Sequence, residues 1–179
     1  MQLFIARHGE TDWNNQKRLQ GHTDIPLNEN GFRQATELAK LISEVAVTHI
    51  LTSNLVRAHE MGRIVSEHLK LPLVIDPRLR ECRFGTIEGL TREEIVERYG
   101  ETFIDSANHV YNFHSVGGER YDEVLKRGLD ALSDFYKQYT DAIPLVISHG
   151  RIIRTLLGLL KLSDIPAQGN FIVGEFDGG

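Results

Sequence analysis

The sequence predicts an α/β protein, a three-layer α/β/α sandwich in which helices cover both faces of a mainly parallel sheet. Three observations support this prediction. Short apolar segments alternate along the chain with longer amphipathic ones, and the short segments are apolar throughout rather than at every second position. Such strands are typical of a parallel sheet that is buried between helices. No linker, repeat or low-complexity tract divides the 179 residues, so residues 1–179 are expected to form a single domain.

Five short apolar segments are the expected strands. Residues 144–148 give the strongest signal of a buried strand, because they contain the unbroken apolar run Leu145-Val146-Ile147. In open sheets of this class, ligands bind beyond the carboxyl ends of the strands, near the point where the strand order reverses. The residues that follow each strand are therefore the first candidates for function. The expected strands are residues 2–6, 49–52, 73–75, 144–148 and 171–176.

The first two expected helices follow polar residues that favour a helix start. Asn28 is expected to cap a helix over about residues 31–44, where apolar side chains recur at helical spacing. Ser53 or Asn54 is expected to cap a second helix, which continues to about residue 69. Both helices would connect neighbouring strands, as the predicted fold requires.

The second half of the chain carries three further helix signals. Thr91 and Glu94 have the spacing of a capping box, which predicts a helix over residues 92–99 that Gly100 ends. Apolar residues recur at helical spacing over 119–139. A last helix is expected to open at Gly150 and to reach about residue 160, and loops or irregular helix are expected over residues 12–28, 78–90 and 101–117.

Charge and cysteine content narrow the range of functions. The formal net charge is −5, which argues against a general affinity for nucleic acids or membrane surfaces, since no overall cationic field attracts polyanions. No apolar run is long enough to span a bilayer. The single cysteine, Cys82, leaves no intrachain disulfide to form. The apolar start of the chain ends at Arg7, too early for a signal peptide, and we expect a cytoplasmic protein.

Two of the expected strands end in the same way. One delivers His8 and Gly9 to the carboxyl edge of the sheet, and the other delivers His149 and Gly150 to the same edge. Glycine allows a ligand to approach the backbone closely. The helix that opens at Gly150 presents free N–H groups and a positive dipole end, which favour an anion. The repeated pattern, with Arg7 beside it, indicates an anion site at His8 and His149.

The other histidines lack this context and are expected to be ordinary polar residues. The sequence has no His-x-His, His-Glu-x-x-His or Cys-His cluster, so it predicts no metal site. Arg57, at the start of the second helix, would by itself be an exposed helix charge, and Glu81 would be an unremarkable loop residue. The six histidines expected to be structural are His22, His49, His59, His68, His109 and His114.

Motifs along nearly the whole chain add a family resemblance to these patterns. Arg7-His8-Gly9-Glu10-Thr11 near the start and Ser148-His149-Gly150 in the last third form a specific combination. The remaining motifs are Trp13-Asn14, Gln20-Gly21, Leu27, Gly31, Gln34-Ala35, Ser53-Asn54-Leu55-Val56-Arg57-Ala58, Leu79-Arg80-Glu81, Phe84-Gly85, Glu88-Gly89, Gly117-Gly118-Glu119 and Ile153-Arg154. In these motifs the chain resembles the histidine phosphatase superfamily, which contains the cofactor-dependent phosphoglycerate mutases and many small phosphatases.

The resemblance implies roles for the residues at the predicted site. It implies that His8 is a nucleophile that forms a phosphohistidine, for which a neutral imidazole has one free lone pair. Arg7, Arg57 and His149 would surround the transferring phosphoryl oxygens. Glu81 would act as general acid and then as general base. No metal is implied, because the basic pocket supplies the positive charge, and further phosphate-binding groups are expected from Asn14, Gln20, Gly21 and Gly150.

The same residues serve phosphatases and mutases. Residues 90–118 contain two cations, Arg92 and Arg98, and the aromatic residues Tyr99, Phe103, Tyr111 and Phe113, which favours a phosphomonoester phosphatase with a partly apolar leaving-group site. A phosphoglycerate mutase, with 2,3-bisphosphoglycerate as cofactor, is one alternative. A catalytically inactive relative that binds phospho-ligands or partners is another. The expected partner is a small phosphate monoester, with no nucleic acid and no membrane, and the oligomeric state stays open, with a homodimer among the alternatives.

Several positions depart from the family pattern. Met61-Gly62 stands where Thr-Ala is usual, which we expect to alter packing rather than activity, and Arg120 stands where serine is common. Arg151 replaces a glycine that often follows Ser-His-Gly. It either contacts a second anionic group of the substrate or is an ordinary helix charge, and the second reading is favoured. Relatives usually continue beyond the position of Gly179, which suggests a truncated or trimmed chain.

Overall fold

The structure, a computed structural model, describes residues 1–101, 103, 112–157 and 166–176. These form one domain with a five-stranded sheet in the order β3-β2-β4-β1-β5. Four strands are parallel, and β5 lies antiparallel to β1 at one edge, so the predicted mainly parallel sheet is confirmed. The strands are β1 (Gln2–Arg7), β2 (His49–Thr52), β3 (Leu73–Ile75), β4 (Pro144–Ser148) and β5 (Phe171–Glu175).

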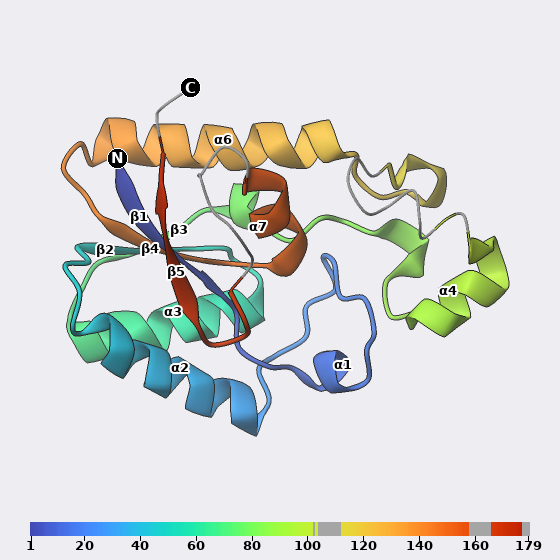
Figure 1. Cartoon of the computed structure of the whole chain (residues 1–179), viewed down its shortest axis with the longest axis horizontal. Helices are drawn as coiled ribbons and strands as arrows, with labels where there is room; N and C mark the ends of the chain where they lie inside the picture. Colours follow the sequence, from blue (N-terminus) through green and yellow to red (C-terminus); the bar gives the residue numbers. More distant parts are fainter. Residues whose placement is uncertain (102, 104–111, 158–165, 177–179) are drawn as a thin grey trace.

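Helices cover both faces of this sheet, which confirms the predicted three-layer sandwich (Figure 1). α2 (Glu29–Ile42) and α3 (Val56–Leu69) pack against each other on one face. α6 (Tyr121–Gln138) and α7 (Gly150–Leu156) pack against each other on the opposite face. Each pair forms its own apolar cluster with the sheet, so the core consists of two layers divided by the strands.

Strand β1 shows why these strands are apolar throughout. Leu3 and Ile5 belong to the cluster under α6 and α7, whereas Phe4 and Ala6 belong to the cluster under α2 and α3. This alternation follows from the two-residue period of a strand. Complete burial of a large aliphatic side chain contributes about 1.5–3 kcal/mol, so a polar residue on either face of β1 would be costly.

The helix starts agree with the sequence in most places. Oδ1 of Asn28 accepts a hydrogen bond from the Gly31 N–H at 2.9 Å, which confirms the predicted cap, although α2 begins at Glu29. The predicted cap of α3 is wrong. This helix begins after Leu55 without a side-chain cap, and the hydroxyl of Ser53 is engaged by the N–H of Leu55 at 3.2 Å and by His149.

The capping box predicted for the fourth helix is confirmed. Thr91 and Glu94 close the first turn of α4 (Arg92–Tyr99), and Gly100 ends it with φ of 84°. The helices predicted over 119–139 and from Gly150 are α6 and α7, and the expected extension of the latter to residue 160 lies outside the described residues.

The segments predicted as loops contain short helical turns. The loop prediction over 12–28 missed α1 (Asp12–Asn15), a single turn closed by a capping box between Thr11 and Asn14. Three 3₁₀ turns, Pro77–Leu79, Gly85–Ile87 and His114–Val116, lie in the other two loop regions. No helix in the described part of the chain is long and apolar enough to cross a membrane.

The strand order places the two histidine-glycine motifs side by side. β1 and β4 are neighbouring parallel strands, with Arg7 paired to Ser148, so His8 and His149 leave the sheet at the same level. The N–H of His8 continues the ladder by donating to the Ser148 carbonyl at 2.9 Å. After β1 the chain turns to the α2 face, and after β4 it turns to the α7 face, which opens the sheet edge between them.

Candidate active site

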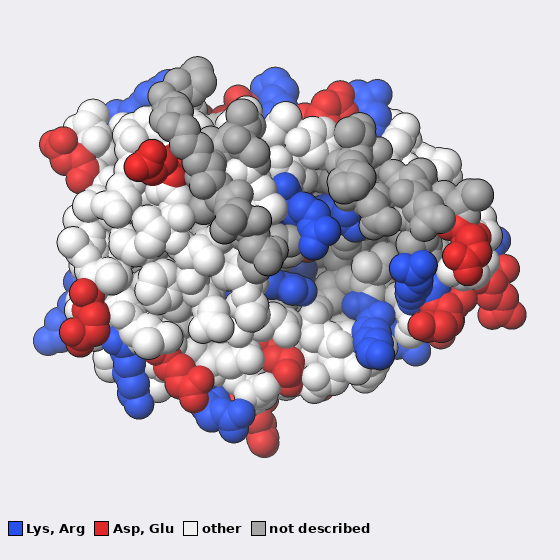
Figure 2. Space-filling view, in the orientation of Figure 1, with Lys and Arg blue, Asp and Glu red and all other residues white. Residues whose placement is uncertain are grey.

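A basic pocket lies at this opening of the sheet edge. Its volume is about 270 Å³, and it is lined by five arginines and, among the described lining residues, by one carboxylate. Figure 2 shows Lys and Arg side chains gathered around a hollow on this face of the molecule. Eight of the nine predicted site residues line the pocket: Arg7, His8, Asn14, Gln20, Gly21, Arg57, Glu81 and Gly150. The ninth, His149, is buried directly beside His8.

The ring of His8 is held in one tautomer. Its Nδ1 lies 2.7 Å from the carbonyl oxygen of Gly9, and a carbonyl can only accept, so Nδ1 carries the proton. The lone pair of the neutral ring is then on Nε2. Burial lowers the pKa of His8 well below its usual value, and the neighbouring charges of Arg57 and Arg7 lower it further. At neutral pH His8 is therefore an uncharged imidazole with a lone pair on a defined nitrogen.

His149 lies against His8 with a ring-centroid distance of 5.1 Å and is completely buried. Its Nε2 lies 2.9 Å from the hydroxyl oxygen of Ser53, which itself accepts the N–H of Leu55. This arrangement favours donation of the Ser53 hydroxyl to an unprotonated Nε2, with the ring proton on Nδ1. Nδ1 is buried and has no hydrogen-bond partner among the described residues. Because a buried donor without a partner is costly, this atom points to a ligand oxygen.

Burial also lowers the pKa of His149 well below its usual value, and the charge of Arg57 acts in the same direction. Both histidines of the site are consequently neutral in the folded protein. Neutral rings beside several arginines leave the net positive charge on the guanidinium groups, where it is fixed and does not depend on pH in the physiological range.

Arg57 is fully buried, so the reading as an exposed helix charge is wrong for this residue. It is the second residue of α3, and its guanidinium donates to the carbonyls of Thr23 at 3.0 Å and Gly21 at 2.7 Å. Burial lowers the pKa of Arg57 to about 10, partly offset by the negative charges of Glu81 and Asp24, so it stays protonated at neutral pH. Its Nε has no partner within the described chain and is a spare donor.

Arg7 is the last residue of β1, and it lines the pocket. Its Nε is buried and lacks a partner among the residues that the structure describes. Its guanidinium carbon would lie 3.4 Å from a Cβ built on Gly150, so the glycine lets the guanidinium pass close to the backbone of α7. Burial lowers the pKa of Arg7, and Glu81 opposes that shift. Arg7 and Arg57 thus both carry unused donors on buried guanidinium groups beside His8.

Glu81 lies at the amino end of α7 and lines the pocket. Its Oε1 accepts N–H bonds from Cys82 at 2.9 Å, Arg151 at 3.0 Å and Ile152 at 3.1 Å, whereas Oε2 accepts one bond, from Arg151 at 3.1 Å. These bonds fix the carboxyl group, because each donor belongs to the backbone. Oε2 is the oxygen with more capacity for a ligand.

The phosphate-binding residues predicted in the first loop lie around the mouth of the pocket. Asn14 Oδ1 accepts the N–H and the hydroxyl of Thr11, at 3.0 and 2.9 Å, which leaves its amide nitrogen available. Gln20 is buried, and its side-chain oxygen has no partner in the described chain. Gly21 has φ of 54°, a conformation that favours glycine, and a Cβ there would collide with Glu88.

Three arginines of the pocket were not predicted as site residues. Arg18, Arg151 and Arg154 also line it. The favoured expectation that Arg151 is an ordinary helix charge is wrong, because its side chain faces the pocket. Arg151 and Arg154 are one helical turn apart and share a face of α7, and this spacing after Ser148-His149-Gly150 is a signal that the sequence contains. Arg18 follows α1 in a loop and has no comparable sequence signal.

A carboxylate outside the pocket ties the first loop to the Glu81 segment. Glu88 accepts the N–H groups of His22 at 3.1 Å, Thr23 at 2.9 Å and Phe84 at 2.9 Å, and the hydroxyl of Thr23 at 2.6 Å. The loop that Arg57 holds from one side is thereby held from the other side by Glu88. Glu88 has no contact with the pocket among the described lining residues, so its role is to position this loop.

The backbone of Glu81 is held by a second polar network. Arg127 of α6 donates to the Glu81 carbonyl at 2.9 Å and forms two bonds to Glu119, at 2.9 and 3.0 Å. His22 also donates to the Glu81 carbonyl, at 2.8 Å, so this histidine is a satisfied polar residue as expected, but it contacts the site. His109 lies outside the described residues. Within the described chain, no three His, Cys, Asp or Glu side chains converge as metal ligands would.

The fold and this pocket are those of an α/β phosphoryl-transfer enzyme. The sequence profile described as histidine phosphatase superfamily (branch 1) matches residues 3–173, so the chain belongs to the histidine phosphatase superfamily. That superfamily contains phosphatases and mutases, and both kinds occur among the relatives of this chain.

Three relatives illustrate this range. The chain is 34% identical over 168 residues to a protein of Enterobacter sp. (strain 638) named "Probable phosphoglycerate mutase GpmB", which covers 89% of this chain and 76% of the relative. Bacillus stearothermophilus YhfR has the same fold with a TM-score of 0.88 and 31% identity, over 99% of this chain and 92% of that one. A mycobacterial glucosyl-3-phosphoglycerate phosphatase, in complex with VO3, superposes with a TM-score of 0.85 and 27% identity, over 96% of this chain and 90% of that one.

Proposed function

We propose that this protein is a phosphomonoester phosphatase that acts through a phosphohistidine on His8. The observation that carries the proposal is the fixed, neutral state of the His8 ring. The Gly9 carbonyl keeps the proton on Nδ1, and burial beside two arginines keeps the ring uncharged. A neutral imidazole whose free lone pair is on a known atom, in a pocket of arginines, is suited to attack a phosphorus centre.

The first half of the reaction transfers the phosphoryl group to the enzyme. The lone pair on Nε2 of His8 forms the N–P bond, and the bond between phosphorus and the ester oxygen breaks in line with it. The departing oxygen takes a proton from the carboxyl group of Glu81, which backbone N–H groups hold in the lining of the same pocket. The alcohol leaves, and the enzyme retains a phosphohistidine and an ionised Glu81.

The second half of the reaction releases phosphate, with Glu81 now acting as a base and His8 as the leaving group. A water molecule attacks the phosphohistidine in the position that the alcohol has left, and Glu81 accepts its proton. The N–P bond breaks, its electron pair returns to Nε2, and inorganic phosphate is formed. Protons and electrons balance over the two steps, and Glu81 is protonated again for the next cycle.

The remaining residues of the pocket stabilise the charge on the phosphoryl oxygens. The unpaired Nε donors of Arg7 and Arg57 and the unpaired Nδ1 of His149 are preorganised for this, since they need no rearrangement when charge develops. Asn14, Gln20, Gly21 and the N–H groups at Gly150 add neutral donors. We propose that no metal or organic cofactor takes part, because these cationic groups supply the charge that a metal would otherwise supply.

Two features favour transfer to water over transfer to a second phosphorylated substrate. The space next to the pocket is lined mainly by aromatic and aliphatic side chains, which suit an apolar alcohol, whereas the phosphoglycerate of a mutase has no apolar group to occupy it. Three of the matching structures come from a protein called a glucosyl-3-phosphoglycerate phosphatase. The mutase alternative, primed by 2,3-bisphosphoglycerate, rests on the names of the curated relatives.

The test measures phosphate release from p-nitrophenyl phosphate with and without chelator, for wild type and His8→Ala. We expect chelator-resistant release by wild type and a loss of about a thousandfold or more in His8→Ala, since the nucleophile is removed. A parallel assay follows conversion of 3-phosphoglycerate in the presence of 2,3-bisphosphoglycerate. Faster isomerisation than hydrolysis would establish the mutase, and absence of both activities would favour an inactive binding relative.

A further inference from the structure

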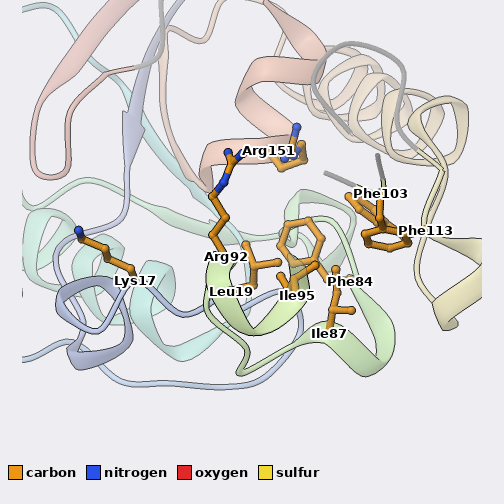
Figure 3. Close-up of a pocket in the computed structure, with 9 residues that line it drawn as sticks. All are labelled: Lys17, Leu19, Phe84, Ile87, Arg92, Ile95, Phe103, Phe113 and Arg151. Carbon is orange, nitrogen blue, oxygen red and sulfur yellow. The ribbon is translucent and has the colours of Figure 1, made fainter. Parts of the chain in front are cut away.

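A second pocket opens directly beside the phosphate pocket. Its volume is about 140 Å³, and it shares Leu19, Phe84 and Arg151 with the first pocket, so the two are continuous. Figure 3 shows the side chains that line it, which come from the first loop, the segment after Glu81, α4, the amino end of α7 and the positions of Phe103 and Phe113. The alcohol part of a phosphate ester bound at His8 has this space next to it.

The walls of the second pocket are apolar and well packed. Phe84 and Phe113 meet edge to face with their ring centroids 5.2 Å apart, and Phe103 lies 6.4 Å from Phe113. A cavity of about 150 Å³ with such a lining accommodates one benzene ring, so a pocket of this size fits one ring-sized apolar group. The six apolar lining residues are Leu19, Phe84, Ile87, Ile95, Phe103 and Phe113.

The rim of the second pocket is cationic. Lys17, Arg92 and Arg151 line it, and no carboxylate does so among the described residues. Figure 3 shows the side chain of Arg92 extending from α4 toward Arg151, with Lys17 on the far side of the view from the phenylalanines. Positive charge from three different segments thus surrounds the opening of the apolar pocket, and this arrangement suits a negatively charged group.

Backbone pairing holds this rim at a fixed place relative to the phosphate pocket. The N–H of Leu19 donates to the Leu90 carbonyl at 3.0 Å, and the N–H of Gly89 donates back to the Leu19 carbonyl at 2.8 Å. Arg18, which lines the phosphate pocket, bonds Gly89 and pairs with Glu94 of α4 at 2.9 Å. The start of α4, and with it Arg92, is therefore anchored to the loop that lines both pockets.

We infer that the substrate is a phosphomonoester whose alcohol carries one ring-sized apolar group and, beyond it, a negatively charged group. This inference rests on the proposed function, because it places the scissile phosphate at His8. The ring occupies the phenylalanine-lined pocket and the outer anion lies between Arg92 and Arg151. A phosphorylated aromatic or alicyclic acid has this chemistry, whereas a short polyol phosphate lacks the ring.

The inference is tested by binding of three phosphonates that the enzyme does not hydrolyse: methylphosphonate, benzylphosphonate and 4-carboxybenzylphosphonate. Calorimetry is expected to show benzylphosphonate bound roughly tenfold more tightly than methylphosphonate, because the ring is removed from water. The carboxylate is expected to add about a further fivefold at low salt and less at high salt. Equal affinities for the first two, or for the last two, would overturn the inference.

Two arginines of α4 provide a matched pair of variants. Arg92→Gln is expected to abolish the preference for the carboxylate and to leave the preference for the ring unchanged. Arg98→Gln removes the same charge from an exposed position of the same helix that does not line the pocket, and it is expected to keep both preferences. An equal effect of the two variants would show a general charge effect and would contradict the proposed contact.

Failure of this inference is distinguishable from failure of the proposed function. Hydrolysis of p-nitrophenyl phosphate by the same wild-type preparation reports the phosphatase activity, and the phosphonate series reports the second pocket without any turnover. Hydrolysis together with equal phosphonate affinities would overturn the inference alone. Graded phosphonate affinities without hydrolysis would overturn the phosphatase proposal and support the second pocket as a ligand site.

Discussion

The phosphate pocket and the apolar pocket beside it are built from different parts of the chain. The first stands on the ends of β1 and β4, where His8 and His149 are fixed by the sheet ladder. The second is formed by α4 and the connecting segments around Phe84 and Phe113, which lie beyond the sheet. In the proposed function, the ends of the sheet strands place the nucleophile, and the connecting segments form the site of the alcohol. Substitutions in the phosphate pocket are therefore expected to lower kcat/KM strongly, and substitutions in the apolar pocket are expected to raise KM moderately.

After the loss of His8 itself, the largest effect is expected in the phosphate pocket, from Arg57→Lys. Lysine lacks the planar fork, so it cannot make the two fixed bonds to Gly21 and Thr23 and also supply the spare Nε donor. We expect kcat/KM to fall by about a hundredfold to a thousandfold, as for loss of one preorganised donor to a transition state.

Arg63→Lys is the matched control for this substitution. Arg63 lies on the same helix, pairs with Glu60 and Glu67 at the surface, and does not line the pocket. Steady-state kinetics should show less than about a twofold change in this variant, since surface ion pairs contribute little. A comparable loss in both variants would mean that α3, rather than the guanidinium of Arg57, is the sensitive element.

Glu81→Gln separates the two halves of the proposed reaction. For an alkyl phosphate, whose leaving group needs a proton, kcat/KM is expected to fall by about a hundredfold or more. For p-nitrophenyl phosphate, whose leaving group departs without help, kcat/KM should fall much less, while phosphohistidine accumulates because the water step lacks its base. Rapid-quench kinetics measure both quantities. An equal fall for the two substrates would remove Glu81 from its proposed role.

The two buried histidines of the phosphate pocket should also make the free energy of unfolding depend on pH. The pKa values of His8 and His149 lie well below the value of about 6.5 that holds in the unfolded chain, so only the unfolded chain takes up these protons just below pH 6.5. Each histidine should then lower the free energy of unfolding by about 1.4 kcal/mol per pH unit as the pH falls below that value. Urea unfolding at pH 7.5 and 5.5 should show a flatter dependence in His8→Asn, and an unchanged dependence in Phe103→Ala.

The smallest effect is expected in the apolar pocket, from Phe103→Ala. Loss of one aromatic contact corresponds to about 0.5–1.5 kcal/mol, so KM for an aryl phosphate should rise about twofold to tenfold, with a smaller change in kcat. Phe32→Ala removes a phenylalanine that is 42% exposed and outside both pockets, and it should leave KM unchanged. A fall in kcat with unchanged KM in Phe103→Ala would show that the division between the two pockets is wrong.

Residues at strand ends could be predicted from the sequence, whereas residues that the packing of distant segments places could not. His8 and His149 follow strands whose apolar runs are evident locally, and neighbouring parallel strands bring their ends together. The burial of Arg57 and the place of Glu81 depend on how distant segments pack, and only the family resemblance indicated them. The orientation of Arg151 differs from the prediction for the same reason, because the surrounding sheet and helices decide which face of a short helix lines the pocket.

For the second pocket, the sequence predicted which kind of side chain lines it but not which segments come together to form it. The aromatic residues of 90–118 predicted an apolar leaving-group site, and Phe103 and Phe113 do line one, whereas Tyr111 lies outside the described residues. Leu19 completes this pocket from a loop about seventy residues away, through backbone bonds to Gly89 and Leu90. Such pairing between irregular segments has no periodic signal, so it could not be predicted from the sequence.

The most direct test of the account is to trap the covalent intermediate. Glu81→Gln enzyme is mixed with p-nitrophenyl phosphate, denatured in base to preserve an N–P bond, digested and analysed by mass spectrometry. The account predicts one added phosphoryl group on the peptide that contains His8, absent when His8→Ala is combined with Glu81→Gln. A phosphoryl group on another residue, or turnover by wild type that His8→Ala leaves unchanged, would contradict it.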